Sequence, residues 1–523
     1  MQQRSIEVIQ SYIDLMASVF SVLATQSEAE LSQIKAADGY DSIFQFVKAR
    51  FDAIRSSAVS DLLETIRFLL DEMDRAEPVQ RIICAEATCL CMDQQISYQD
   101  HQTIWENGRM YLFDILPLRD DKPLLLDHPL NSNWKDTGIC IIPRFPVSTA
   151  ATYIDSKLKD RPLSGRNTPY GINRELVNVG YYPWDTDVPD VQHIILSDRQ
   201  LPSTHDQVSK TRVAFSPIAD HAQLLDLENK PKTALNGRSC TGIFVSGVKE
   251  TQMLNVRYSE CWEMACELSP DVFFAPEMIA TDEMVSVDNL RSKYLKPLLK
   301  KVVADGKTPP RLTILPTHWR NRRNRLLVFD ETGKHIGTQF KRKPFVDEKN
   351  HAAEALELPL ANADVLLIHL KNKQRIAFAI CSDFLIGQED YVSDFLCKKL
   401  GATLVLVPSY SQGEQDFAAA ISAVKRFGTS VVWGNCCGAV PKKDKKPTER
   451  IIGACCYAGT DAIHRLGRVQ KCDFACEGTQ GCVFSVELPT RVELNKPNTT
   501  PMPEISHLCG QISAEKTTAT DVI

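Results

Sequence analysis

The chain has 523 residues, of which 43% are hydrophobic and 24% charged, so two or three domains of an ordinary globular kind are expected. This composition excludes a disordered, fibrous or membrane protein as a description of the whole chain. The formal net charge of −6 argues against global nucleic-acid binding but leaves room for a local basic patch.

The start of the chain lacks the basic region, apolar core and small-residue cleavage site of a signal peptide. No apolar run approaches the ~20 residues that a membrane-spanning helix needs, so no membrane partner is expected. The 17 cysteines are scattered and odd in number. Free thiols in a reducing, cytoplasmic environment are therefore predicted.

The first stretch, residues 1–118, shows helical periodicity. Apolar residues recur at spacings of three and four over residues 6–23, 43–54 and 62–73, with little Gly or Pro between them. Ser27 with Glu30 is a candidate capping box for a short additional helix. These patterns predict an all-α N-terminal domain over residues 1–118.

Residues 119–205 differ in composition, because proline becomes frequent and only short apolar segments occur. Residues 138–142 and 191–195 are typical of brief strands. This region is either a small irregular domain or a Pro-rich connection between domains, and the sequence leaves both alternatives open.

Residues 206–492 alternate short β-rich runs with longer helical stretches, which predicts a layered α/β domain. The expected strands cover residues 212–215, 242–245, 271–274, 311–315, 326–329, 376–380, 403–407 and 430–433. The expected helices cover residues 253–268, 287–303, 389–400 and 416–427. The tail, residues 493–523, is rich in Thr, Pro and Ser and is predicted to be disordered.

Three apolar strands of this domain end in a reactive side chain. Residues 271–277 run into Glu277, residues 339–348 carry Lys341, Lys343 and Glu348, and residues 376–383 end in Cys381 and Asp383. Strands hold such end groups rigidly at the edge of a sheet, where α/β folds place their sites.

In this order and at these separations, the three segments resemble the nitrilase or carbon–nitrogen hydrolase superfamily. Residues 324–333, 400–409 and 432–438 resemble further stretches of that family. The resemblance implies an αββα sandwich that commonly forms a dimer or a larger homo-oligomer. It also implies a catalytic triad of Glu277, Lys341 and Cys381, with Glu348 as a second glutamate that holds the lysine and the substrate.

The chemistry of these residue types agrees with the resemblance. A thiolate at Cys381 can attack a carbonyl carbon, and Glu277 can accept the thiol proton if burial raises its pKa. The ammonium of Lys341 can stabilise the oxyanion, with the backbone N–H after the cysteine as a second donor. Lys343 lies two residues away and remains an alternative to Lys341.

The acidic Asp383, two residues after the nucleophile, is similar to amidase-like members of the family and favours amides over nitriles as substrates. The sequence therefore predicts a hydrolase acting on C–N bonds other than peptide bonds. Its substrate is a non-peptide or peptide-like amide, and residues 1–118 are expected to regulate or target the enzyme. The alternatives are acyl transfer to an amine, or an inactive scaffold or sensor that acts through protein partners, as in bacterial stress or antiviral defence.

Two further groups of residues have a functional and a structural interpretation. The basic stretch at residues 318–325 is either a solvated loop or part of the rim of the site. The rim candidates are Arg320, Arg322, Asn324 and, from a later strand, Ser409. The spacing of Cys472, Cys476 and Cys482 is not that of a zinc site. No metal and no cofactor are predicted.

Overall fold

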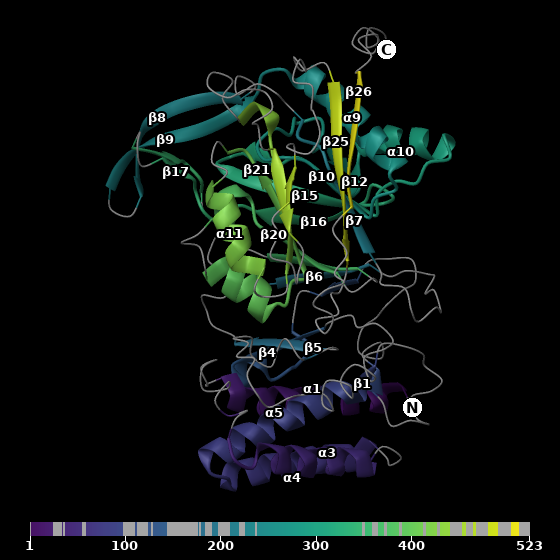
Figure 1. The fold of residues 1–523 in the computed structure, drawn as a ribbon, viewed down its shortest axis with the longest axis vertical. Helices are drawn as coiled ribbons and strands as arrows, with labels where there is room; N and C mark the ends of the chain where they lie inside the picture. The colour runs from purple at the N-terminus through teal and green to yellow at the C-terminus, as the bar shows by residue number, and fades with distance from the viewer. Residues whose placement is uncertain are drawn as a thin grey trace. The chain divides into compact units, whose positions relative to one another are not determined.

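The fold was analysed in a computed structural model, which forms two compact units (Figure 1). The first comprises residues 1–207 with 368–375 and 395–401, and the second comprises residues 208–367, 376–394 and 402–523. The structure describes residues 2–24, 34, 37–54, 59–97, 110–111, 124–126, 129–143, 176, 179–183, 191–196, 210–218, 225–235, 238–347, 351–357, 365–370, 374–385, 390–411, 415–425, 429–439, 452–456, 464–466, 480–489 and 504–511.

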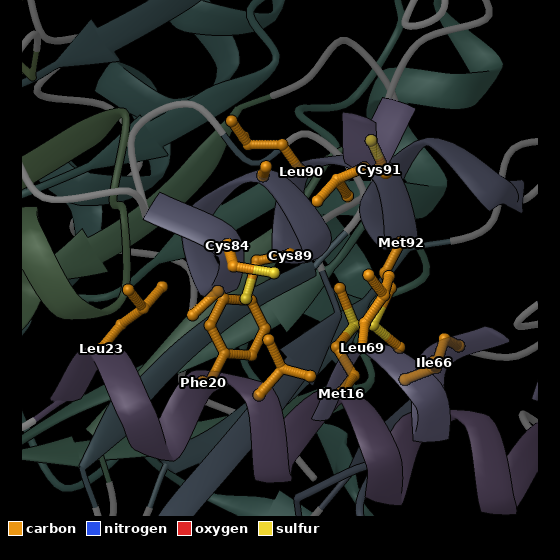
Figure 2. Close-up of a cluster of buried hydrophobic side chains, with 14 of the residues drawn as sticks. Met16, Phe20, Leu23, Ile66, Leu69, Cys84, Cys89, Leu90, Cys91 and Met92 are labelled. Atoms are coloured by element: carbon orange, nitrogen blue, oxygen red, sulfur yellow. The ribbon is translucent and has the colours of Figure 1, made fainter. Parts of the chain in front are cut away.

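The first unit has a helical core. Its long helices are α1 (Gln2–Ala24), α3 (Tyr40–Ile54), α4 (Val59–Arg75) and α5 (Pro78–Gln95). The first three confirm helices predicted from periodicity, whereas α5 is a further helix that the periodicity does not predict. The candidate capping box at Ser27 and Glu30 lies outside the described residues. Helix α5 is buried almost all round, and Figure 2 shows its side chains packed with those of α1 and α4: Met16, Phe20, Leu23, Ile66, Leu69, Cys84, Cys89, Leu90, Cys91 and Met92.

The Pro-rich region adds strands to this unit. Strands β4 (Ile139–Pro143) and β5 (Val179–Pro183) form an antiparallel pair, and the ring of Tyr181 stacks on Phe20 of α1 at 4.2 Å. Strands β3 (Leu124–Leu126) and β6 (Val191–Ile195) form another antiparallel pair. The all-α description of residues 1–118 extends only to Gln95, because β1 (Ile96–Ser97) and β2 (Met110–Tyr111) pair in parallel.

The second unit contains two large sheets. The first has the strand order β14 (His318–Arg320), β15 (Arg323–Asp330), β13 (Leu312–Ile314), β10 (Val272–Phe274), β7 (Lys210–Phe215), β25 (Gln480–Pro489) and β26 (Glu504–Gln511), with β16 (His335–Phe340) also on β15. The second has the order β24 (His464–Leu466), β23 (Gly453–Cys456), β22 (Ser430–Asn435), β21 (Leu404–Ser409) and β20 (Arg375–Phe378), followed by the first residues of β19 (Val365–His369).

Helices cover the outer faces of these two sheets (Figure 1). Helix α9 (Thr251–Glu267) packs on the first sheet, where the indole Nε1 of Trp262 donates to Thr313 Oγ1 at 3.0 Å, and α10 (Leu295–Ala304) lies beside α9. Helix α11 (Gln415–Lys425) packs on the second sheet through the stacked rings of Phe417 and Trp433. The second unit is therefore a mixed α/β domain, as the alternation of β-rich and helical stretches predicts.

Two predicted features of the second unit differ in the structure. The helix expected over residues 287–303 begins only at Leu295, because β11 (Val287–Asp288) and β12 (Arg291–Ser292) form a tight antiparallel pair. Residues 504–511 of the tail that is predicted to be disordered form β26, which pairs along β25. Pairing supplies backbone hydrogen bonds that composition cannot indicate, and it covers an otherwise open edge of β25.

A small third sheet completes the second unit. Its order is β17 (Val346–Asp347), β18 (Ala352–Glu354), β9 (Arg238–Val248) and β8 (Leu225–Leu235). A π-helix, Asp390–Lys399, occupies the stretch for which a helix over residues 389–400 is predicted. Within the described part of the chain, no helix is long and apolar enough to cross a membrane.

Gly434 marks a close approach of the two large sheets, and its substitution gives a stability prediction. A Cβ atom placed on Gly434 would lie 2.3 Å from Cε2 of the Phe215 ring. We therefore expect Gly434→Ala to lower the free energy of unfolding by about 1–3 kcal/mol through overpacking. Urea denaturation measures this loss. Gly247→Ala, at a glycine with open space around it, is the matched control, and an equal effect of the two substitutions would contradict the explanation.

Candidate active site

Three of the predicted side chains come from the ends of strands in the second unit. Glu277 follows β10 after two residues, Lys341 directly follows β16, and Cys381 opens a 3-10 turn after β20. All three side chains are buried. The apolar strands that precede them, such as Val272–Phe274, fix the points at which these side chains enter the interior.

The carboxylate of Glu277 is held by three donors. Lys341 Nζ lies 2.7 Å from Oε1, and Asn324 Nδ2 donates to the same oxygen at 2.8 Å. The backbone N–H of Tyr410 donates to Oε2 at 3.1 Å. The charge of this carboxylate also acts on the thiol of Cys381, whose pKa it raises.

Lys341 lies between two carboxylates. Its Nζ is 2.7 Å from Oε2 of Glu354, and Phe345 N donates to that same Oε2 at 2.9 Å. Glu354 therefore holds the lysine, which is the role expected of Glu348, a residue outside the described part of the chain. In the sequence, the feature that could have identified Glu354 is its place as the single carboxylate in the apolar run 352–356, whose residues are otherwise Ala and Leu.

Lys343, the alternative lysine, contacts the site through its backbone. Its N–H donates to Asp383 Oδ1 at 2.8 Å, and its carbonyl accepts a hydrogen bond from Ser382 Oγ at 2.8 Å. Strand β16 ends at Phe340, so the alternation of side chains along a strand does not extend to Lys343. The structure brings Lys341, rather than Lys343, to Glu277.

Burial and neighbouring charges shift the pKa values of this cluster. Burial raises the pKa of Glu277, and the ammonium of Lys341 offsets part of that rise. Burial alone would lower the pKa of Lys341, but the carboxylates of Glu277 and Glu354 outweigh it, so the pKa lies above its ordinary value. The lysine therefore stays charged at neutral pH.

Cys381 has an unusual backbone and a protonated thiol. Its φ of 48° lies in the left-handed region, where a side chain other than glycine is strained. Burial, followed by the charge of Glu277, raises the pKa of the thiol well above its ordinary value, although Lys341 and the backbone N–H of Tyr410 lower it. At rest the thiol therefore keeps its proton and needs a base at the moment of attack.

Asp383 connects the turn of Cys381 to the segment after Lys341. Its carboxylate accepts hydrogen bonds from the backbone N–H groups of Arg342 at 3.0 Å, Lys343 at 2.8 Å and Ile380 at 3.3 Å. The hydrogen bond from Ser382 Oγ to the Lys343 carbonyl strengthens the same connection. Asp383 therefore supports the positions of Cys381 and Lys341 through backbone N–H groups next to them rather than through their side chains.

The four rim candidates fall into two groups. Arg320 and Arg322 are exposed on the hairpin turn between β14 and β15, where Asn321 and Arg322 both have positive φ. Asn324 and Ser409 are buried, which differs from the rim position expected for them. Asn324 contacts Glu277 through its side chain, and the carbonyl of Ser409 lies 3.5 Å from the backbone N of Glu277.

No group of His, Cys, Asp and Glu side chains that could hold a metal ion occurs among the described residues. Of the three cysteines weighed as a metal cluster, Cys472 and Cys476 lie outside the described part of the chain, and Cys482 is a buried free thiol. The Glu277, Lys341 and Cys381 constellation requires no metal for its hydrogen bonds.

Asp383 gives a prediction about pH and stability. Burial raises its pKa to about 7 from 3.8, although Lys341 and three backbone N–H groups lower it. The folded state therefore binds a proton that the unfolded state has lost, so the stability contributed by this residue falls as pH rises from about 4 to about 7. We expect the neutral isostere Asp383→Asn to remove that slope, which is on the order of a few kcal/mol over the window.

Urea denaturation of both proteins at pH 5 and pH 8 measures the difference. Asp330→Asn, at a half-buried turn carboxylate, is the control. An unchanged pH dependence in Asp383→Asn would contradict the assignment of the raised pKa to this residue.

No protein-family model matches the chain, and no curated protein matches it. Among solved structures, an amidase from Nesterenkonia sp. is 12% identical over 58% of this chain and 92% of its own, with a TM-score of 0.30. Saccharomyces cerevisiae Nit3, described as a member of branch 10 of the nitrilase superfamily, is 14% identical over 45% of this chain and 79% of its own, with a TM-score of 0.29. These are distant similarities, and they carry no argument about activity.

Proposed function

We propose that this chain is an amidase-type carbon–nitrogen hydrolase that works through a thioester on Cys381. One observation carries the proposal: a buried ammonium lies between two carboxylates, and the charge of one of these carboxylates, Glu277, acts on the buried thiol of Cys381 and raises its pKa. A buried charge cluster of this kind is costly to form, and perturbed titratable groups concentrate at functional sites.

The first half of the reaction follows from the contacts of Cys381. The sulfur attacks the carbonyl carbon of the amide, an S–C bond forms, and the thiol proton passes to Glu277. The ammonium of Lys341 and the backbone N–H of Ser382 stabilise the oxyanion. The C–N bond then breaks, Glu277 returns the proton to the leaving nitrogen, and ammonia or an amine departs.

The second half hydrolyses the thioester. Glu277, again a carboxylate, takes a proton from a water molecule as its oxygen attacks the acyl carbon. The C–S bond breaks, the sulfur recovers a proton from Glu277, and the carboxylic acid leaves. One carboxylate therefore serves both halves, and its raised pKa brings it closer to the working pH.

The substrate class is tested by incubating the wild-type protein with amides, nitriles and amide-plus-amine mixtures. Ammonia release and intact mass are measured, and peptide mapping locates any acyl group. The proposal expects turnover of amides, with a transient acyl mass on the peptide that contains Cys381. Turnover of nitriles alone, or transfer to amines without hydrolysis, would replace the amidase assignment. If a broad panel of amides and nitriles gave neither turnover nor an acyl adduct, the proposal that this chain is a hydrolase would be wrong.

A second candidate function uses the first unit. Its own hydrophobic core, built from α1, α3, α4 and α5, makes residues 1–118 a candidate for regulating or targeting the hydrolase, or for binding a protein partner. In that case the second unit would act as a scaffold or sensor. Cellular effects that survive both Glu277→Gln and Cys381→Ala would favour this function over catalysis.

A further inference from the structure

Asn324 links the basic hairpin to the catalytic cluster, and the proposed function gives it no role. It lies on β15, is buried, and donates from Nδ2 to Glu277 Oε1 at 2.8 Å. We infer that Asn324 is a positioning residue that orients the Glu277 carboxylate so that Oε2 is the oxygen that exchanges the proton with Cys381. This inference rests on the proposed function.

The orientation follows from the lone pairs of the carboxylate. Each oxygen of an ionised carboxylate offers about two acceptor sites. Lys341 and Asn324 occupy both sites of Oε1, whereas Oε2 accepts one hydrogen bond, from the backbone N–H of Tyr410. One site of Oε2 therefore remains for the thiol of Cys381, which interacts with the charge of this carboxylate.

Asn324 also contacts the lysine of the cluster. Its backbone carbonyl accepts a hydrogen bond from the backbone N–H of Lys341 at 2.8 Å. The same residue thus fixes the backbone from which the lysine projects and the carboxylate that the lysine faces. Because both contacts come from one strand, β15, this strand fixes the distance between the Lys341 ammonium and the Glu277 carboxylate.

The amide oxygen of Asn324 indicates that this side chain acts through its amide N–H group. Within the described part of the chain, Oδ1 is buried and has no hydrogen-bond partner, which is unfavourable for a carbonyl oxygen. The reversed amide would place this oxygen against Glu277 Oε1, so the orientation is set by the hydrogen-bond network. An apolar residue would avoid the unpaired oxygen. The benefit of asparagine at this position is therefore the N–H that it gives to Glu277.

Loss of this donor has a defined effect on pH dependence. A hydrogen bond to the charged form of an acid lowers its pKa, so removing the bond raises the pKa of Glu277. The reactivity of Cys381 should fall on the acidic side of its pH profile, where Glu277 becomes protonated. We expect this acidic limb of the profile to move upward by about one to two pH units in Asn324→Ala. In Asn324→Asp, which has the same shape, a further carboxylate near Glu277 should move the limb at least as far.

The experiment measures the rate at which iodoacetamide alkylates Cys381 in the full-length protein from pH 5 to pH 9, by peptide mass. The proteins compared are wild type, Asn324→Ala, Asn324→Asp, Glu277→Gln and the control Arg323→Gln. Arg323 precedes Asn324 on β15 and is exposed, so its side chain points to the opposite face. Its profile should match that of the wild type. Thermal unfolding verifies folding, and the isosteric Asp variant carries the test if the Ala variant is unstable.

The outcomes separate this inference from the proposed function. An acidic limb that is lost in Glu277→Gln and shifted in the Asn324 variants supports both. A limb that is lost in Glu277→Gln but unchanged in both Asn324 variants overturns the positioning role alone. A profile that Glu277→Gln leaves intact, or a wild-type Cys381 that is not alkylated at any pH, overturns the proposed function.

Discussion

Replacing Cys381 by alanine is expected to abolish amide turnover and the acyl adduct, with a loss of at least about 10⁴-fold in kcat. The thiol is the atom that bonds to the acyl group, and water alone cannot take its place. Cys381→Ser should also lose most of the rate, because a hydroxyl is a weaker nucleophile and has a higher pKa.

The measurement combines steady-state turnover with intact mass after rapid quenching. Cys266→Ala is the matched control, because Cys266 is a buried free thiol on α9 that is not among the contacts of the cluster. The control should retain both the activity and the adduct. If Cys381→Ala hydrolyses the amide as fast as the wild type, Cys381 is not the nucleophile, and the proposed mechanism fails.

Replacing Lys341 by methionine is expected to reduce both activity and stability. The substitution removes an oxyanion donor, which typically costs about 10²–10³ in kcat. It also leaves the buried carboxylates of Glu277 and Glu354 without their shared ammonium. Breaking a buried ion pair by removing one partner destabilises a protein by about 3–5 kcal/mol, so this variant should be less stable at neutral pH.

The pH dependence distinguishes this explanation from a simple packing defect. Without the ammonium, which lowers the pKa of Glu277 in the wild type, that pKa should rise further, and the folded variant should bind a proton that the unfolded chain releases. The stability lost at pH 7 should therefore be partly regained as pH falls toward about 5. Urea denaturation at several pH values measures this recovery.

Lys343→Met is the matched control for Lys341→Met. It makes the same chemical change two residues away, at a half-buried lysine that contacts Asp383 through its backbone. The control should retain most of the activity and show no recovery of stability at low pH. If Lys343→Met were the more damaging substitution, Lys343 would replace Lys341 as the catalytic lysine.

Short apolar runs predict the buried central strands of the two large sheets, such as β10, β13, β21 and β22, because a strand buried between layers must be apolar over several residues. The expected residues 430–433 lie within β22, for example, and the expected strand 403–407 overlaps β21 from Leu404 onward. Helical periodicity similarly predicts α1, α3 and α4. The strand in the tail could not be predicted in this way, since β26 pairs with β25 and lies in a tail whose overall composition, rich in Thr, Pro and Ser, indicates disorder.

The reactive residue types and their order along the chain are readable from the sequence, because each follows an apolar strand that delivers it to the edge of a sheet. Which atoms meet at that edge depends on chain folding. Glu354 reaches Lys341 through a separate small sheet, and Asn324 reaches Glu277 across 47 residues. Hydrogen bonds act over about 3 Å in space, whereas spacing along the chain restricts contacts only within one helix or strand. Cys381 could thus be proposed as a nucleophile from the sequence, whereas its contacts with the proposed base, the lysine and the supporting donors exist only in the folded chain.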